Sequence, residues 1–230
     1  MITMNDLLNL DSASLVPRNP PCPPEPWEAL IMEYLVAMTT RVPDGTPEQA
    51  VSDVRAREAA RSRELAAQGH LRRLWRPPLR PGEWRTLGLF AAPDDGELER
   101  VLASMPLRVW RTDEVTPLSP HPNDPVPPPA PGPPEFLTTF TLTIPEGTPQ
   151  QVVDDANAGE ARSARALAGQ GHLLRLWRLP PGGPGALGLW RARDAAEMQA
   201  IMESLPLYAW MTVRTTPLTP HPSDPVAATL

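Results

Sequence analysis

The pattern of hydrophobic and polar residues predicts the same series of elements twice along the chain. Residues 34–42 and 136–144 alternate between polar residues and β-branched or aromatic ones, which indicates strands with one buried face. Each strand leads into a Pro-x-Gly-Thr-Pro turn. We expect Thr46 and Thr148 to be helix N-caps, because a proline follows each of them at the first helical position.

Each predicted first helix ends at a glycine, Gly69 or Gly171, and the rest of the copy follows. A second helix has an apolar stripe at helical spacing. The stripe consists of Leu98, Val101, Leu102 and Met105 in the first copy and of Met198, Ile201, Met202 and Leu205 in the second. The remaining strands are expected at 70–76, at 87–90 and from Leu107, and again at 172–178, at 187–190 and from Leu207.

The chain is therefore a tandem duplication. A His-Leu-x-Arg-Leu-Trp-Arg motif at 70–76 returns at 172–178, and Thr-Pro-Leu-x-Pro-His-Pro at 116–122 returns at 216–222. The module has about 90 residues, which is too long for a solenoid unit and suits a small domain. Strand, helix, strand, strand, helix, strand is the order of a ferredoxin-like domain. We predict an α+β protein of two ferredoxin-like (βαββαβ) domains, whose antiparallel sheets pack together as a dimeric α+β barrel-type pseudo-dimer.

The domain boundaries follow from the repeat and from the proline content. The first copy spans 27–125 and the second spans 135–230, with a Pro-rich segment at 126–134 as an extended tether between them. Residues 1–26 belong to neither copy. Because Leu-Val-Pro-Arg at 15–18 resembles a thrombin-type cleavage sequence, we interpret this segment as a disordered or expression-derived leader.

The two-residue period of a strand assigns side chains to the two faces of each sheet. Those expected to face the helices in the second copy are Leu174, Leu176, Leu207, Ala209 and Met211. Those expected on the opposite face are Arg73, Trp75, Arg108 and Trp110 in the first copy and Leu173, Arg175, Trp177, Tyr208 and Trp210 in the second. Tryptophans with a few arginines describe a small-molecule pocket, and a core between two sheets is the alternative interpretation.

A glutamate interrupts the apolar stripe of the first helix in both copies. Glu58 stands in a stripe with Val51, Val54 and Leu65, and Glu160 takes the same position in the second copy. Partial burial would raise the pKa of such a carboxyl group and let it accept and return a proton near neutral pH. The alternatives are an ion pair or a wet edge of the stripe.

Composition excludes several classes of function. The net charge is −6, which argues against a general nucleic-acid-binding protein. All 21 cationic residues are arginine, so lysine nucleophiles and Schiff bases are excluded. The one cysteine, Cys22, lies outside both copies, which argues against disulfides and thiol catalysis. No apolar run approaches the roughly 20 residues that cross a bilayer, so we expect a cytoplasmic protein without a membrane partner.

The four histidines form two equivalent pairs, His70 with His172 and His121 with His221. Neither HxH nor HxxxH spacing occurs, so no metal site is predicted. His70 and His172 directly follow a helix-ending glycine, which favours a capping or core position. His121 and His221 lie between prolines near the end of each copy, where they either reach a neighbouring pocket or belong to an exposed turn.

These motifs together resemble the muconolactone delta-isomerase family over nearly the full length of both copies. The resemblance rests on the Pro-rich turn before the first helix, the central glutamate, Gly-x-x-x-Arg-Leu-Trp-Arg, and a hydrophobic residue with Pro-Leu before the last strand. The closing Thr-Pro-Leu-x-x-His-Pro completes it. The residues concerned are Met105-Pro106-Leu107, Leu205-Pro206-Leu207, His121-Pro122 and His221-Pro222.

The resemblance implies an isomerase without a cofactor that shifts a carbon–carbon double bond in an unsaturated lactone by moving a proton. Glu58 and Glu160 fall at the acid/base position of the family. Arg73 and Arg175 would hold a substrate carboxylate or polarise its carbonyl. The residues expected to line the rest of the pocket are Trp75, Trp110, Trp177, Tyr208, Trp210, His121 and His221.

The chain also departs from the family pattern, so the small-molecule substrate stays open. The family has histidine where Arg73 and Arg175 stand, and its following His-Tyr pair is replaced by Glu83-Trp84 or by a Pro/Gly turn. Arginine in place of lysine, with many prolines and alanines, suggests a GC-rich bacterial genome. A cyclase or other rearrangement enzyme of natural-product biosynthesis is one alternative, and a non-catalytic binding or assembly protein is another. In each case we expect a homo-oligomer of two-domain subunits.

Overall fold

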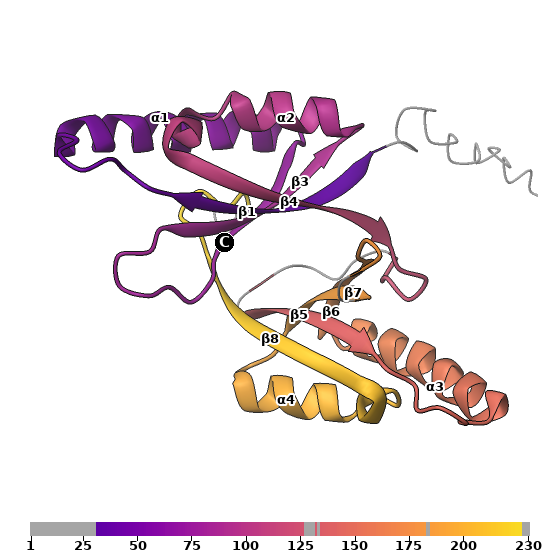
Figure 1. Ribbon diagram of the computed structural model, residues 1–230. Coiled ribbons are helices and arrows are strands. Elements are labelled where there is room, and N and C mark those ends of the chain that lie inside the picture. The colour runs from indigo at the N-terminus through magenta and orange to yellow at the C-terminus, as the bar shows by residue number, and fades with distance from the viewer. Residues whose placement is uncertain (1–30, 127–131, 133, 183–184, 227–230) are drawn as a thin grey trace, which may run out of the picture. The chain divides into compact units, whose positions relative to one another are not determined.

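The computed structural model describes residues 31–126, 132, 134–182 and 185–226, and it has the same α+β arrangement in both copies (Figure 1). The first copy contains β1 (Met32–Thr40), α1 (Glu48–Ala67), β2 (Leu71–Arg76), β3 (Arg85–Ala92), α2 (Asp95–Ala103), the 3-10 helix η2 (Pro106–Trp110) and β4 (Arg111–Pro120). The second copy contains β5 (Glu135–Leu142), α3 (Gln150–Gly169), β6 (Leu173–Arg178), β7 (Ala186–Arg191), α4 (Ala195–Glu203), the 3-10 helix η3 (Tyr208–Trp210) and β8 (Met211–Pro220). The predicted leader at 1–26 and most of the predicted tether at 126–134 lie outside the described residues.

The strands form one closed barrel in the order β1-β3-β2-β8-β5-β7-β6-β4. All strand pairs are antiparallel, which confirms the predicted α+β class with an antiparallel sheet. Two pairings join the copies. The end of β8 pairs with β2 at Trp75 and Arg76, and the end of β4 pairs with β6. The last strand of each copy therefore ends beside the other copy.

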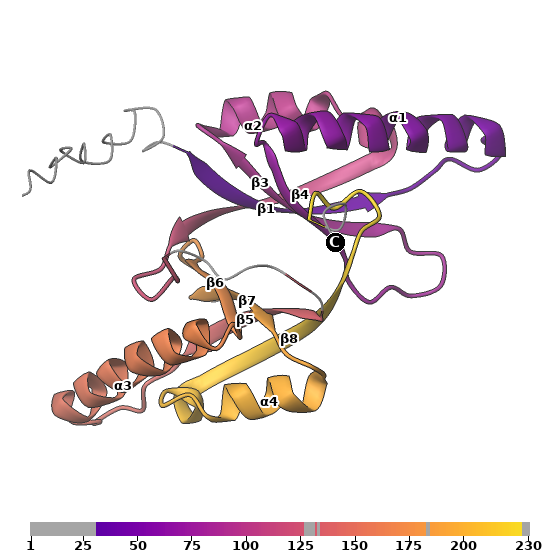
Figure 2. The same ribbon diagram turned by 180° about the vertical axis from the view of Figure 1, so that it is seen from behind.

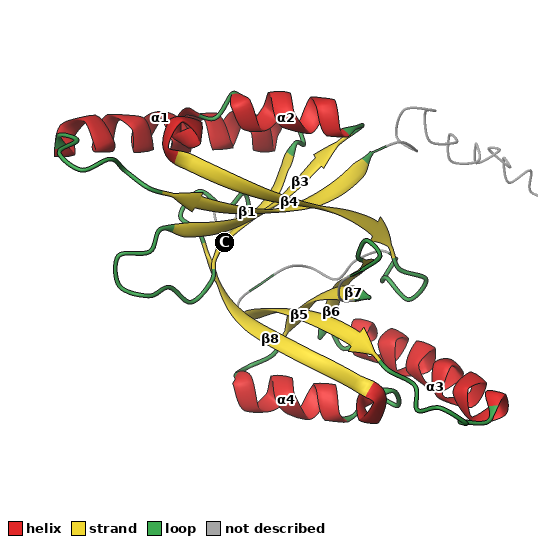
Figure 3. Ribbon diagram, in the orientation of Figure 1, coloured by secondary structure: helices red, strands yellow, loops and turns green. Residues whose placement is uncertain are grey.

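The helices lie on the outer face of the sheets, as seen from both sides in Figures 2 and 3. Between them and the sheets lie two equivalent hydrophobic cores, one in each copy. The predicted stripe of the second helix is confirmed, because all of its residues in α2 and α4 and the turns after them are buried. Burial of such apolar side chains stabilises the fold by about 25 cal/mol per Å² removed from water.

A third hydrophobic core fills the interior of the barrel, and it contains the strand tryptophans. Trp75 and Trp177 are each 1% exposed and pack there with leucines of both copies. The interpretation of these tryptophans as a core between sheets therefore fits the structure. The predicted face assignment in the second copy was wrong for two leucines, since Leu173 packs against the helices and Leu174 packs inside the barrel. A β-bulge between Leu173 and Arg175 inserts one residue and reverses the faces before it.

Two further predictions about element ends were wrong. The last strands begin at Arg111 and Met211 instead of Leu107 and Leu207, because a 3-10 helix with a preceding proline occupies the residues before them. The first helix of each copy begins after Pro47 or Pro149, without a side-chain cap. Thr46 instead closes the turn before the helix, where its Oγ1 donates to the carbonyl of Pro43.

Each junction between the copies contains an arginine bound to carboxylates of the other copy. Arg73 donates from Nη1 and Nη2 to both carboxylate oxygens of Glu135, at 2.9 and 2.6 Å, and it also pairs with Asp224. The indole Nε1 of Trp75 donates to the same Glu135 at 2.7 Å, and the Arg73 guanidinium lies 4.7 Å from its ring centroid. Hydrogen bonds, an ion pair and a cation–π contact thus converge on one buried carboxylate.

The second junction repeats this arrangement with more solvent. Arg175 binds Glu33 and Asp124 of the first copy, and Trp177 donates to Glu33. The Arg175 and Glu33 side chains are 23% and 20% exposed, whereas those of Arg73 and Glu135 are 7% and 0% exposed. Because solvent screens charges at the second junction, the first should contribute more to stability.

We therefore expect Glu135→Gln to lower the free energy of unfolding by about 3 kcal/mol, since it leaves a buried guanidinium without its bidentate partner. The matched variant Glu33→Gln should cost about 1 kcal/mol, because its partner is partly hydrated. Urea unfolding followed by tryptophan fluorescence would measure both. Equal losses in the two variants would contradict the proposed difference between the junctions.

Candidate functional site

The first copy contains a cavity of about 480 Å³ between α1 and the end of its sheet, which we call the Glu58 cavity. Its walls come from α1, from the ends of β1 and β2, from the start of β3 and from the segment that includes η2. Residues 221–223, from the end of the second copy, complete it. A cavity of this size accommodates a small organic molecule.

The second copy contains the equivalent Glu160 cavity, of about 540 Å³. Glu160 of α3 takes the position of Glu58, and residues 121–123 of the first copy take the position of residues 221–223. Each cavity therefore joins a helix glutamate from one copy to a histidine turn from the other. The sequence analysis proposed both glutamates and both histidines without indicating that they combine across the copies.

Pairing of the last strands brings the histidines to the opposite cavities. The backbone N–H of His221 donates to the Leu74 carbonyl at 2.9 Å, and the N–H of His121 donates to the Leu176 carbonyl at 3.3 Å. Asp224 then closes the turn, because its own N–H donates to the His221 carbonyl at 2.8 Å. Since the Asp224 carboxylate also binds Arg73, the junction between the copies fixes the position of this turn.

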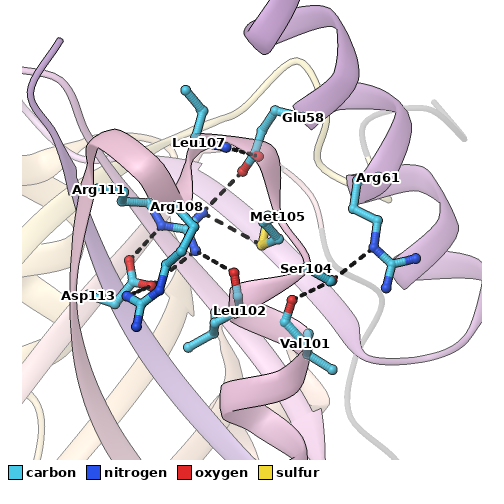
Figure 4. A network of polar contacts seen from close by, with 10 residues as sticks. All are labelled: Glu58, Arg61, Val101, Leu102, Ser104, Met105, Leu107, Arg108, Arg111 and Asp113. Atoms are coloured by element: carbon cyan, nitrogen blue, oxygen red, sulfur yellow. Dashed lines mark hydrogen bonds and ion pairs between the residues drawn. The ribbon is translucent and has the colours of Figure 1, made fainter.

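The Glu58 carboxylate is held by two groups at the start of the last strand (Figure 4). Its Oε2 accepts a hydrogen bond from the backbone N–H of Leu107 at 2.8 Å, and its Oε1 accepts one from Arg111 at 3.1 Å. Arg111 in turn is bound to Asp113 at 2.6 Å. Burial raises the pKa of Glu58, and the Leu107 N–H and the Arg111 charge oppose that rise.

The Glu160 carboxylate has a simpler environment. Its Oε2 accepts a hydrogen bond from the Leu207 N–H at 3.1 Å. Met211 stands where the first copy has Arg111, and in the described part of the chain no cation forms an ion pair with Glu160. Burial raises the pKa of Glu160, with the Leu207 N–H as the opposing contribution. One oxygen of this carboxylate is thus left open to a bound molecule.

The histidines face the cavities as neutral hydrogen-bond donors. Nδ1 of His221 accepts from the Ser223 N–H at 3.1 Å, and Nδ1 of His121 accepts from the Asn123 N–H at the same distance. With Nδ1 as the acceptor, the proton of a neutral ring is on Nε2. Burial and the charges of Arg76 and Arg55 lower the pKa of His221 to about 4, and burial with Arg178 lowers that of His121.

The other predicted site residues lie outside both cavities. Arg73, Trp75, Arg175 and Trp177 form the two junctions, where their polar atoms bind carboxylates of the other copy. None of Trp110, Tyr208 and Trp210 lines either cavity. They lie in the 3-10 helices and not in strands, so the two-residue period that assigned them to a pocket face does not apply there. The predicted pocket on the inner sheet face is replaced by two cavities under the helices.

Sequence analysis missed the arginines that line the cavities. These are Arg55, Arg76 and Arg111 in the Glu58 cavity and Arg178 in the Glu160 cavity. Arg76 and Arg178 end the repeated Leu-Trp-Arg motif, which offered one signal. Arg111 had a second signal, since the equivalent position in the other copy is methionine.

Two searches for other kinds of site gave negative results over the described residues. No group of three or more histidine, cysteine or acidic side chains among them could hold a metal ion. None of the helices in these residues has the length and apolar character that crossing a membrane requires.

Comparison with known proteins identifies the repeated module. The family model of muconolactone delta-isomerase matches the chain twice, at residues 32–124 and 135–224. Muconolactone Delta-isomerase 1 of Acinetobacter lwoffii is 33% identical over 92 residues, which make up 40% of this chain and 93% of that protein. Muconolactone Delta-isomerase of Cupriavidus pinatubonensis is also 33% identical over 92 residues, with 97% of that protein covered. The sequence resemblance to this family is thereby confirmed.

One solved structure resembles both copies together. It is described as a heme-binding protein from Thermus thermophilus, and it covers 86% of this chain and 95% of its own with a TM-score of 0.56. At 11% sequence identity, this likeness concerns the fold alone.

The histidine environment predicts an unusual titration. NMR of the ring protons should place the pKa of His221 at about 4, below its ordinary value of 6.5. Because the folded-state pKa is depressed, the unfolded chain binds more protons between these values, and this contribution to stability is lost as the pH falls from 6.5 toward 4. Arg55→Asn should raise the pKa by removing one neighbouring charge. Titration of His221 near 6.5 in the folded protein would contradict a buried neutral ring.

Proposed function

The chain belongs to the muconolactone delta-isomerase family, and on that premise we propose that it is a cofactor-independent isomerase that moves a proton within a small unsaturated lactone or related carbonyl compound. The observation that supports this most is the recurrence of one arrangement in both copies. A partly buried glutamate and a neutral histidine from the other copy line the same cavity.

In the proposed reaction the glutamate carries the proton. Its carboxylate removes a proton from the carbon at one end of the conjugated system, and the carbon–carbon double bond shifts as electrons move toward the carbonyl oxygen. The carboxyl group then returns the proton to the carbon beside the carbonyl, so that substrate and product have the same composition. A raised pKa suits this task, because the group must be both a base and an acid near neutral pH.

The histidine suits the other half of the reaction. Negative charge develops on the carbonyl oxygen when the proton leaves carbon. The Nε2–H of His221 or His121 can donate a hydrogen bond to that oxygen without first losing a proton itself. A cavity largely shielded from water strengthens such a bond.

Haem chemistry is the alternative that the solved structure brings to mind, and the histidines do not fit it. An iron-bound histidine normally donates from its second ring nitrogen, which fixes the ligating one as unprotonated. In His121 and His221 the second nitrogen accepts a hydrogen bond, so Nε2 carries the proton. His70 and His172 have the suitable orientation, with Nδ1 3.0 Å from a backbone carbonyl, but neither lines a cavity described above.

The proposal retains two other sequence-based expectations. A cyclisation on the same pair of groups would use the same proton transfer, so it is the second candidate reaction. Self-association of the two-domain chain stays a prediction. A non-catalytic binding protein would have the cavities without turnover, and this is the alternative that the following experiment separates from an enzyme.

The double variant Glu58→Gln/Glu160→Gln should lower kcat on muconolactone by about 100- to 10,000-fold, because it removes the group that transfers the proton. The loss of the conjugated double bond can be followed by ultraviolet absorbance. Glu64→Gln is the matched control, since Glu64 is an exposed glutamate of the same helix, paired with Arg61. Each single variant reports the share of one cavity. Turnover that survives in the double variant would overturn the proposed chemistry.

The crossed origin of the site predicts a particular combination of losses. In a Glu160→Gln background, the remaining activity depends on the Glu58 cavity and should fall about tenfold or more with His221→Ala, which removes one donor to the developing oxyanion. His121→Ala in the same background should leave that activity nearly unchanged. The reverse pattern would contradict the crossed arrangement, and circular dichroism would establish that each variant is folded.

A further inference from the structure

The two cavities have the same catalytic pair but different linings. At five equivalent positions a polar or charged residue of the Glu58 cavity is replaced in the Glu160 cavity. The replacements are Thr40 by Leu142, Arg55 by Asn157, Ser62 by Ala164, Thr86 by Ala186 and Arg111 by Met211. Four of these five changes introduce an apolar side chain, so the difference is directional and not scattered.

From this difference we infer that the cavities select different substrates: the Glu58 cavity takes a small molecule with a carboxylate, and the Glu160 cavity takes an uncharged, more apolar one. This inference rests on the proposed function in so far as it treats both cavities as substrate sites. It adds the chemical class that each one recognises.

The carboxylate site is argued from two arginines near the histidine of the Glu58 cavity. Arg55 and Arg76 both line this cavity and both act electrostatically on His221. Among the described residues neither forms an ion pair with a carboxylate of the chain, and the Arg55 guanidinium lies 5.2 Å from the ring centroid of Trp84. Stacking of this kind leaves the edge of the guanidinium available, and that edge matches a carboxylate in geometry and charge.

The third arginine of the Glu58 cavity is already occupied. Arg111 binds Asp113 and Glu58, so its charge is balanced by the chain. Its effect on selection is therefore indirect, since it keeps the Glu58 carboxylate paired while an anionic substrate enters. Without such a partner, a second negative charge beside Glu58 would be repelled.

The Glu160 cavity has the opposite character. Arg178 is the arginine that lines it, because Asn157 stands in place of Arg55 and Met211 in place of Arg111. Apolar side chains form much of its wall, among them Phe140, Trp190 and Leu142. A carboxylate bound here would lose its hydration without gaining a pair of guanidinium partners, which disfavours it relative to an ester or a lactone without a charge.

The chain contains methionines that report occupancy of each cavity separately. Met38 and Met105 line the Glu58 cavity, and Met211 lines the Glu160 cavity. The protein labelled with ¹³C at the methionine methyl groups would be titrated with muconolactone, which carries a carboxylate at neutral pH, and with its uncharged methyl ester. The acid should shift Met38 and Met105 at lower concentration than Met211, and the ester should shift Met211 first.

Exchange of one equivalent residue tests the cause. Arg55→Asn gives the first copy the residue of the second, and it should weaken binding of the acid to the Glu58 cavity about tenfold while the ester is little affected. Asn157→Arg is the reciprocal variant and should strengthen acid binding at Met211. Both positions are exposed on their helices, so the variants should fold, and thermal unfolding would verify this.

The inference is overturned if acid and ester shift the three methionines at equal concentrations, or if Arg55→Asn leaves acid binding unchanged. Binding is measured without turnover, so the result stands apart from the proposed reaction. Separation of the two probes in a protein that turns over neither would support the inference and contradict the isomerase proposal. Turnover without separation would do the reverse.

Discussion

The buried pairing of Arg73 with Glu135 is the interaction on which the rest of the structure depends. A guanidinium and a carboxylate that are withdrawn from water must satisfy each other, and here both also engage a neighbour, Asp224 for one and Trp75 for the other. These partners come from β2, β5 and the segment after β8, so the ion pair can form only when the two copies close into one barrel. Its demands on geometry therefore fix how the copies meet.

The same constraint builds the candidate sites. Asp224 is bound by Arg73 and closes the turn that contains His221, so the arginine fixes a histidine that it does not touch. The equivalent chain of contacts runs from Arg175 through Asp124 to His121. Each cavity thus needs both copies, which gives a physical reason for keeping them in one polypeptide. A covalent link also lets the two halves diverge separately, since a change in one cavity is not imposed on the other.

Part of this arrangement followed from the sequence, and the errors have identifiable causes. Apolar periodicity placed the helices and put Glu58 in a stripe beside Val54 and Leu65, because helical spacing is a local property. The assignment of sheet faces failed where a bulge precedes Arg175 and where 3-10 helices replace the expected strand starts, since one inserted residue reverses a two-residue period. Arg73 and Trp75 were predicted to contact substrate because an arginine near a tryptophan looks alike in a pocket and in a buried ion pair.

What the sequence determined by itself is the duplicated α+β module, its family, and the identity of the helix glutamates, because repeats, periodicity and motifs are written in the order of residues. What only the tertiary structure decided is which residues share a cavity. His221 meets Glu58, and not Glu160 of its own copy, because β8 extends past its own sheet to pair with β2. Pairing between strands so distant in the chain depends on the closure of the whole barrel, and no local pattern records it.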